Sequence, residues 1–120
     1  MVQYHGRITR AGKKRSYAMG GEFPDTKVGE TKKKTIRERS GSIKEKMVYA
    51  QYANVMFKNG AKPKKCKIVS MVSNPVSADL TRRKVITRGA VIEVDDGGKN
   101  FKAKVTSRPG QVGAISAVEQ

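Results

Sequence analysis

The chain has few of the residues that disulfide bonding, zinc binding or membrane insertion would need. Its 120 residues include one cysteine, Cys66, and no tryptophan. A single cysteine excludes an internal disulfide and a multi-cysteine zinc site, which suits a reducing compartment, and we expect Cys66 to be an inert residue of a buried strand. The apolar runs are too short to span a membrane, and the polar, basic N-terminus has no apolar stretch typical of a signal peptide. We therefore expect a cytoplasmic protein.

Acidic residues are also scarce. The sequence has 10 Asp and Glu against 26 Lys and Arg, which gives a net charge of +16. A compact chain with this much like charge repels itself, and a polyanion whose counterions it displaces is the usual partner. Nucleic acid is favoured over an anionic membrane surface, because the sequence shows no basic amphipathic helix of useful length.

The sequence offers no constellation of catalytic or metal-binding residues. The one histidine, His5, lies in a segment that we expect to be disordered, so it has no rigid partner for acid-base chemistry. Asp95 and Asp96 are adjacent, but the two glycines that follow them indicate a turn rather than a metal site. No Gly-Lys-Ser/Thr phosphate loop is present. We expect no enzyme activity, no cofactor, no metal and no small-molecule substrate, although an RNA-modifying enzyme was the alternative to consider.

The most informative stretch is residues 81–94. It joins a basic cluster, Arg82 to Lys84 and then Arg88, to two β-branched runs, residues 85–87 and 90–94. Gly89 separates the runs, so we predict two strand segments with a bend or bulge between them. Arginines on such a fixed backbone can bind a rigid anionic partner at modest entropic cost, and we interpret that partner as RNA.

The N-terminal part of the chain differs from the rest. Residues 1–20 hold five basic residues and no acidic one, and they are too poor in apolar groups to fold alone. They form either a solvated basic tail or an arm that threads along RNA, with cations on phosphates and rings on unpaired bases. We predict an arm over residues 1–33 and a body over residues 34–120. The candidate RNA-binding residues of the arm are Arg7, Arg10, Lys13, Lys14, Arg15, Tyr17, Lys32 and Lys33.

The body has the alternation and the turns of an all-β fold. Strands are predicted over residues 34–39, 43–57, 66–72, 85–87, 90–94, 99–107 and 112–118. Both faces of the second run carry apolar groups, so we expect part of this strand to be buried on both sides or kinked. A helix over residues 43–54 is the competing prediction. Asn59-Gly60 predicts a type I′ hairpin, and Arg108-Pro109-Gly110 predicts a type II turn. Residues 76–80 are expected to be a loop or a single helical turn. About six or seven strands at this spacing indicate a small antiparallel β-barrel or sandwich.

Several segments together resemble a known family. They are residues 26–30, residues 52–55, Asn74-Pro75, the block from Arg82 to Glu93, and residues 105–111 with their Thr-Ser-Arg-Pro-Gly-Gln segment. In this order they closely resemble the archaeal and eukaryotic small-subunit ribosomal protein eight of the eukaryotic type. The resemblance covers roughly residues 13–118, and the short length is similar to the archaeal form.

The resemblance implies a β-barrel body on small-subunit ribosomal RNA, a basic arm laid into that RNA, ribosomal proteins as neighbours and no catalysis. Lys13 to Tyr17 resembles the family's basic stretch that ends in a tyrosine, and Arg82 to Lys84 resembles its basic cluster at the barrel mouth. A free nucleic-acid-binding or RNA-chaperone protein remains the alternative. The candidate RNA-binding residues of the body, chosen by charge placement, are Lys34, Arg37, Arg39, Arg82, Arg83, Lys84, Arg88 and Arg108. The lysines at 102 and 104 fit a solvated outer face equally well.

Overall fold

The computed structural model describes residue 6, residues 15–18 and residues 20–120. In chain order the elements are η1 (Ser16–Ala18), β1 (Lys27–Val28), β2 (Lys32–Arg37), β3 (Ile43–Ala50), β4 (Tyr52–Met56), β5 (Lys64–Ser73), α1 (Ala78–Arg82), β6 (Val91–Asp95), β7 (Asn100–Val105) and β8 (Ser116–Glu119). The fold is therefore all-β apart from two short helical turns, as predicted. Among the described residues, no helix is long and apolar enough to cross a membrane.

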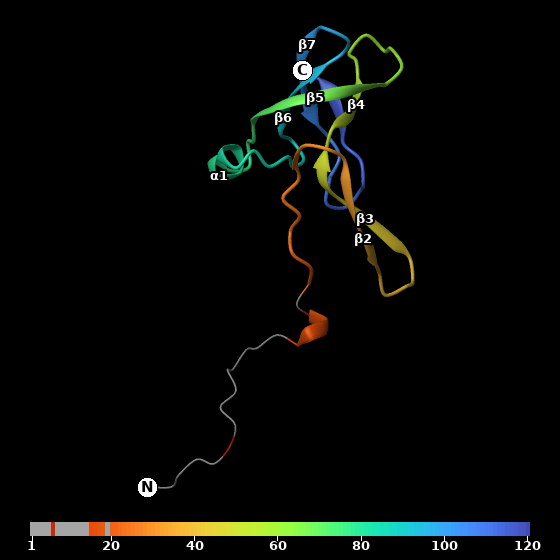
Figure 1. The fold of residues 1–120 in the computed structure, drawn as a ribbon, viewed down its shortest axis with the longest axis vertical. Coiled ribbons are helices and arrows are strands. Elements are labelled where there is room, and N and C mark those ends of the chain that lie inside the picture. The colour runs from red at the N-terminus through yellow and green to blue at the C-terminus, as the bar shows by residue number, and fades with distance from the viewer. Residues whose placement is uncertain (1–5, 7–14, 19) are drawn as a thin grey trace.

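The strands form a closed barrel and a separate sheet. The barrel has the order β4-β5-β6-β7-β8, and the sheet has the order β1-β3-β2. Barrel neighbours are antiparallel except β4 and β8, which close the barrel as a parallel pair. The predicted barrel is confirmed, but it closes with five strands, because three of the eight strands form the second sheet. Figure 1 shows β2 and β3 as a hairpin that projects from the barrel.

The barrel core is made mainly of alanine, valine and isoleucine side chains, at alternate positions of the strands. Ala53 and Val55 of β4 point inward, as do Ile92 and Val94 of β6. Inward and outward alternation of this kind is what a strand with one buried face requires. The whole buried cluster comprises Met47, Ala50, Ala53, Val55, Cys66, Ile68, Met71, Ile86, Ile92, Val94, Ala103, Val105, Ile115 and Ala117. This buried cluster contains no aromatic ring, which suits the narrow interior that a five-strand barrel leaves.

Residues 43–57 are strand, and the competing helix is excluded. The run is interrupted at Gln51, where β3 leaves the small sheet and β4 enters the barrel. Near the end of β3 both Met47 and Ala50 are buried, whereas β4 buries the alternate positions Ala53 and Val55. The kink between two sheets therefore explains the apolar groups on both faces of the run.

Two turn types differ from the sequence prediction. A type I′ turn needs positive φ at both central residues. Gly60 has a φ of +68°, but among the described residues only Lys84 is a non-glycine with positive φ, so Asn59 does not meet the requirement. The predicted hairpin is present, because β4 and β5 pair antiparallel, but the predicted type I′ turn is wrong. The connection runs from Met56 to Lys64 instead, and Pro63, which has no backbone donor, directly precedes the new strand.

The turn at residues 108–111 exists but is not of type II. Gln111 N donates to Arg108 O over 2.9 Å, yet Gly110 does not have the positive φ that a type II turn requires. The reason for this glycine lies elsewhere in the chain. A Cβ at position 110 would lie 2.8 Å from Cγ of Pro24, so the glycine permits close packing of the N-terminal segment.

The central stretch contains one strand rather than two. Only Val91–Asp95 forms a strand, while residues 85–87 are a loop in which Val85 and Ile86 are nonetheless buried. Ile86 N donates to Thr26 O over 2.8 Å, so its backbone pairs with the N-terminal segment instead of a ladder. Gly89 forms the predicted bend with a φ of +87°. Residues 76–80 lead into the short helix α1, which fits the predicted single turn.

The N-terminal segment joins the fold before residue 34. Thr26 is 1% exposed, and its Oγ1 donates to Met47 O over 2.8 Å. β1 then pairs with β3 in parallel. The predicted boundary at residues 33 and 34 falls inside β2, and the division into an arm and a body stays a prediction.

Candidate nucleic-acid interface

The basic cluster at residues 82–84 is presented by the end of α1. Ser77 caps the helix with an extended φ of −160°, and its hydroxyl accepts from Asp79 N over 3.2 Å. At the other end Lys84 N donates to Thr81 O over 3.1 Å and Val85 N donates to Leu80 O over 2.9 Å. These two bonds form a Schellman motif, with Lys84 in the left-handed region at a φ of 53°. The motif reverses the chain sharply, so the cations stay exposed while Val85 enters the interior.

Asn74 fixes the loop that follows. Its side chain is buried, and its Nδ2 donates to Val85 O over 3.0 Å and to Thr87 Oγ1 over 2.8 Å. Its Oδ1 accepts from Val76 N over 3.1 Å, and its backbone N donates to Thr81 Oγ1 over 2.9 Å. Asn74 thus links the end of β5 to the helix through its backbone N and to residues 85–87 through its side-chain amide. The loop from Arg83 to Arg88 is therefore fixed by hydrogen bonds although it pairs with no strand.

The N-terminal segment is joined to the same loop. Arg83 forms ion pairs with Asp25 and with Asp79, and the second spans 3.5 Å. Ile86 N donates to Thr26 O. Arg82 also contacts Asp79, over 2.9 Å, but its side chain is 81% exposed. The structure therefore separates the cluster into Arg83, which connects two segments, and Arg82 and Lys84, which face solvent.

Arg88 and Arg108 lie on two loops at one side of the barrel. Arg88 follows the loop that Asn74 holds, and Arg108 opens the turn before β8. Both are exposed, and both line one cavity with Phe23. Within the described part of the chain, neither guanidinium has a carboxylate partner. Two cations so placed favour an anion between them.

The hairpin of β2 and β3 carries a second group of cations. Lys33 pairs with Glu45 over 2.8 Å. Lys34 lies opposite Lys46 in the register of the two strands, and among the described residues neither has an acidic partner. Like charges directly opposite each other destabilise a sheet unless an anion neutralises them. Lys32 and Arg37 are exposed on the same strand.

On the outer face of the barrel the pattern is different. Lys102 of β7 lies opposite Glu93 of β6, so this lysine has an opposite charge across the strand pair. Lys104 lies opposite Val91. At Lys102 the positive charge is therefore balanced within the protein, which supports a solvated face there.

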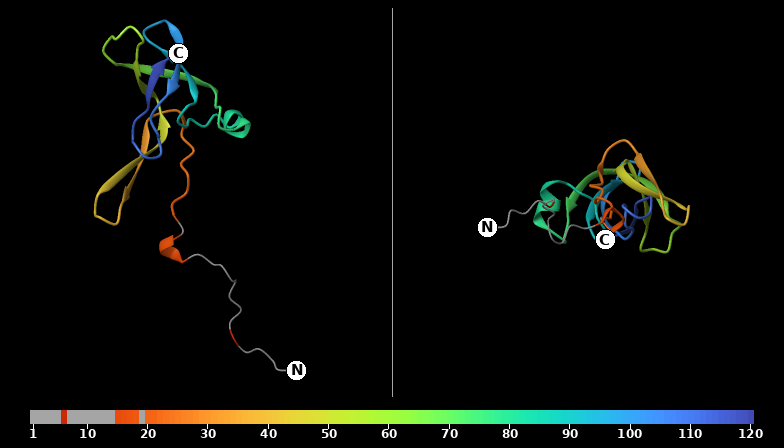
Figure 2. Two further views of the ribbon diagram at one scale, coloured as in Figure 1. Left: turned by 180° about the vertical axis from the view of Figure 1, so that it is seen from behind. Right: turned by 90° about the horizontal axis from the view of Figure 1, so that it is seen from below.

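The basic groups of α1, of the loops with Arg88 and Arg108, and of the β2–β3 hairpin lie around the point where the N-terminal segment leaves the barrel. Figures 1 and 2 show residues 20–25 leaving the barrel between α1 on one side and the β2–β3 hairpin on the other. Of the predicted arm residues, Arg15 and Tyr17 are exposed, and Arg39 donates to Tyr17 O over 3.0 Å. Four predicted residues lie outside the described part of the chain: Arg7, Arg10, Lys13 and Lys14.

Nothing in the described residues groups three or more His, Cys, Asp or Glu side chains as a metal site would. Asp95 Oδ1 accepts from Gly98 N over 2.7 Å, which closes the β6–β7 turn. Cys66 is buried, and burial, followed by the negative charge of Asp96, raises the pKa of its thiol. A protonated, enclosed thiol is a poor nucleophile and a poor metal ligand.

The residues that position the cations were missed at the sequence level. In the sequence Asn74 and Thr26 stand out only as members of the segments that resemble the family, and Thr26 also falls in the predicted arm. A polar residue followed by proline is a weak signal for a buried hub, and Thr26 gives no local signal at all. Phe23 was also overlooked, although an aromatic residue in a basic segment could have been considered for base stacking.

The fold and its surface define a class: small, strongly basic β-barrel proteins whose cations lie on fixed loops and a projecting hairpin. The family model described as Ribosomal protein S8e matches residues 4–118. The chain is 43% identical over 114 residues to the small ribosomal subunit protein eS8 of Nanoarchaeum equitans. This match covers 94% of this chain and 87% of that protein. For the eS8 proteins of Methanococcus maripaludis and Pyrobaculum aerophilum the identity is 39%, over 93% and 94% of this chain and 85% of each relative. The chain belongs to the S8e family of ribosomal proteins, which confirms the resemblance.

Proposed function

We propose that the protein is a structural constituent of the small ribosomal subunit that binds and stabilises small-subunit ribosomal RNA. Family membership supports the ribosomal role, and the curated relatives carry small-subunit names. Its partners are this RNA and neighbouring ribosomal proteins, and its location is the cytoplasmic ribosome. In this proposal it acts by binding RNA rather than by catalysis.

One observation supports the RNA-binding part most strongly. The loop that Asn74 holds presents Arg82, Lys84 and Arg88 to solvent on a backbone fixed by hydrogen bonds. Ordered cations lose little entropy when they bind phosphate, and the arginine fork can bind it with two hydrogen bonds. The arm and the hairpin add further cations, which increase affinity without selecting a site.

The test is the affinity of the full chain for small-subunit ribosomal RNA and for an unrelated RNA of equal length, over a salt series. A second protein replaces Arg7, Arg10, Lys13 and Lys14 with serine. We expect the intact protein to prefer the ribosomal RNA at high salt. The serine variant should keep that preference and have a smaller salt slope, because each lost phosphate contact lowers the slope by about one.

A third protein carries Arg82→Ala together with Arg88→Ala and should lose the preference. Equal affinity of the intact protein for both RNAs would contradict the proposal and favour a free RNA chaperone. Co-sedimentation with small ribosomal subunits after a high-salt wash separates these two functions, since a loosely bound chaperone would wash off.

A further inference from the structure

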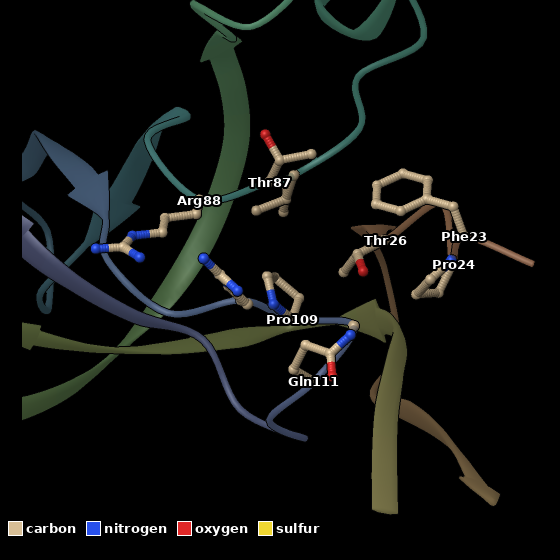
Figure 3. Close-up of a pocket in the computed structure, with 10 residues that line it drawn as sticks. Phe23, Pro24, Thr26, Thr87, Arg88, Pro109 and Gln111 are labelled. Carbon is tan, nitrogen blue, oxygen red and sulfur yellow. The ribbon is translucent and has the colours of Figure 1, made fainter. Parts of the chain in front are cut away.

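A cavity of about 160 Å³ lies beside the barrel where three segments meet. Phe23 and Pro24 of the N-terminal segment form one wall, residues 86–88 form a second, and residues 108–111 form a third. Figure 3 shows the Phe23 ring beside Thr87, with Pro109 below and the Arg88 side chain extending away from the ring. The cavity thus has an apolar end at Phe23 and a cationic side at Arg88.

The size and the surfaces of the cavity suit one flat ring. An apolar cavity of about 150 Å³ holds a molecule the size of benzene. Phe23 is 62% exposed although it is a large apolar residue, and Ile86 and Pro109 add apolar surface. The polar side chains of the lining are those of Thr26, Thr87, Arg88, Arg108 and Gln111, and the hydroxyls of the two threonines are hydrogen-bonded within the protein. None of the described residues that line the cavity is acidic.

The cavity is formed before any ligand arrives, because its three walls are hydrogen-bonded in series. Met47 N donates to Pro109 O over 2.8 Å, and Met47 O accepts from Thr26 Oγ1 over 2.8 Å. Thr26 O in turn accepts from Ile86 N over 2.8 Å. Gly110 allows Pro24 to pack closely against the third wall. A preformed site binds without the cost of ordering its walls.

We propose that this cavity takes a single unpaired nucleobase of the ribosomal RNA, stacked on Phe23, with the adjoining phosphate between Arg88 and Arg108. The proposal rests on the proposed function and adds a specific contact to it. A flat apolar wall next to two uncompensated cations matches a nucleotide, which joins an aromatic ring to an anion. Proteins commonly read single-stranded RNA by stacking splayed bases on aromatic rings. An apolar peptide side chain would not use the two cations.

The test uses the absence of tryptophan from the sequence. Phe23→Trp places a single fluorophore in the cavity, and Tyr52→Trp places one on β4, where Tyr52 is 40% exposed and does not line the cavity. Titration with small-subunit ribosomal RNA should quench the fluorescence of the first variant strongly and that of the second weakly. Equal quenching at both positions would overturn the assignment of the site.

Affinity measurements separate stacking from charge. Phe23→Ala should weaken binding to the ribosomal RNA about tenfold, as loss of one stacked base does, with no change in the salt slope. Arg88→Ala should weaken binding and lower the slope by about one. Tyr52→Ala is the matched aromatic control and should bind like the intact protein. Circular dichroism of the free variants checks that each is folded.

The outcomes distinguish this inference from the function on which it rests. If the intact protein does not prefer ribosomal RNA, the proposed function fails first. If the intact protein prefers it but Phe23→Ala binds equally well, or if tryptophan at position 23 is not quenched, only the nucleobase site is wrong. Quenching of that tryptophan by an isolated ribosomal protein, and not by RNA, would identify a peptide as the occupant.

Discussion

Lys34 and Lys46 lie directly opposite each other on the β2–β3 hairpin, with no acidic partner among the described residues. Residues opposite each other in an antiparallel pair have Cβ atoms about 5 Å apart, so the two ammonium groups repel in the free protein. This repulsion therefore destabilises the hairpin in the free protein, and a bound phosphate would neutralise it.

Lys46→Glu tests this relationship. The substitution converts a like-charge pair into an opposite pair, so the free energy of unfolding should rise by about 0.5 kcal/mol in a urea titration. Affinity for ribosomal RNA should fall and its salt slope should decrease, since the hairpin loses one cation and gains an anion that repels phosphate. Lys102→Glu is the matched control, because it changes the net charge equally but places a like charge opposite Glu93. That control should lose stability, and a gain in both variants would contradict the argument.

Asn74 should be among the most sensitive polar residues for folding. Asn74→Ala removes the donor to Val85 O and leaves that buried carbonyl without this partner. The cost should be about 1–3 kcal/mol in the free energy of unfolding, measured with urea. The same variant should bind ribosomal RNA less well, because the cations of the loop lose their fixed backbone. Asn54→Ala changes an exposed amide on β4 and should leave the free energy of unfolding almost unchanged. Equal losses of stability in both variants would show that Asn74 has no special role in folding.

The buried thiol gives stability a dependence on pH. Burial raises the pKa of Cys66 in the folded protein, so the folded state holds its proton more tightly than the unfolded state does. Stability from this group is fully present below the ordinary cysteine pKa of about 8.5 and is lost as the pH rises through the folded pKa. The free energy of unfolding should fall more steeply between pH 8 and 10 for the natural protein than for Cys66→Ala. Parallel curves would show that the thiol does not contribute.

Local alternation was enough to predict most strands. β7 alternates Phe101, Ala103 and Val105 with lysines, and the structure buries that face. The alternation says which residues point inward, because it depends only on the period of a strand. It does not say which strands pair, so neither the parallel closure between β4 and β8 nor the separate sheet could be predicted.

The errors share a physical cause, which is contact between distant parts of the chain. Val85 and Ile86 are β-branched and buried, yet the partners of their backbones are Asn74 and Thr26 rather than a neighbouring strand. Glycine is needed at position 110 because Pro24 packs closely against it, and not because of the turn in which it lies. For the candidate site, composition identified the cations, but only the structure separates paired Arg83 from unpaired Arg88 among the described residues.

Lys84 combines a charge with a backbone conformation that suits glycine. Its φ of 53° at the end of α1 costs a non-glycine residue about 1 kcal/mol, so Lys84→Gly should raise the free energy of unfolding by roughly that amount. The same variant should bind ribosomal RNA more weakly, with a salt slope lower by about one, because a phosphate contact is lost. Lys84→Ala separates the two effects: it removes the charge but keeps a Cβ, so it should lower the slope equally without the gain in stability. If Lys84→Gly is stabilised and binds RNA like the natural protein, Lys84 lies outside the interface.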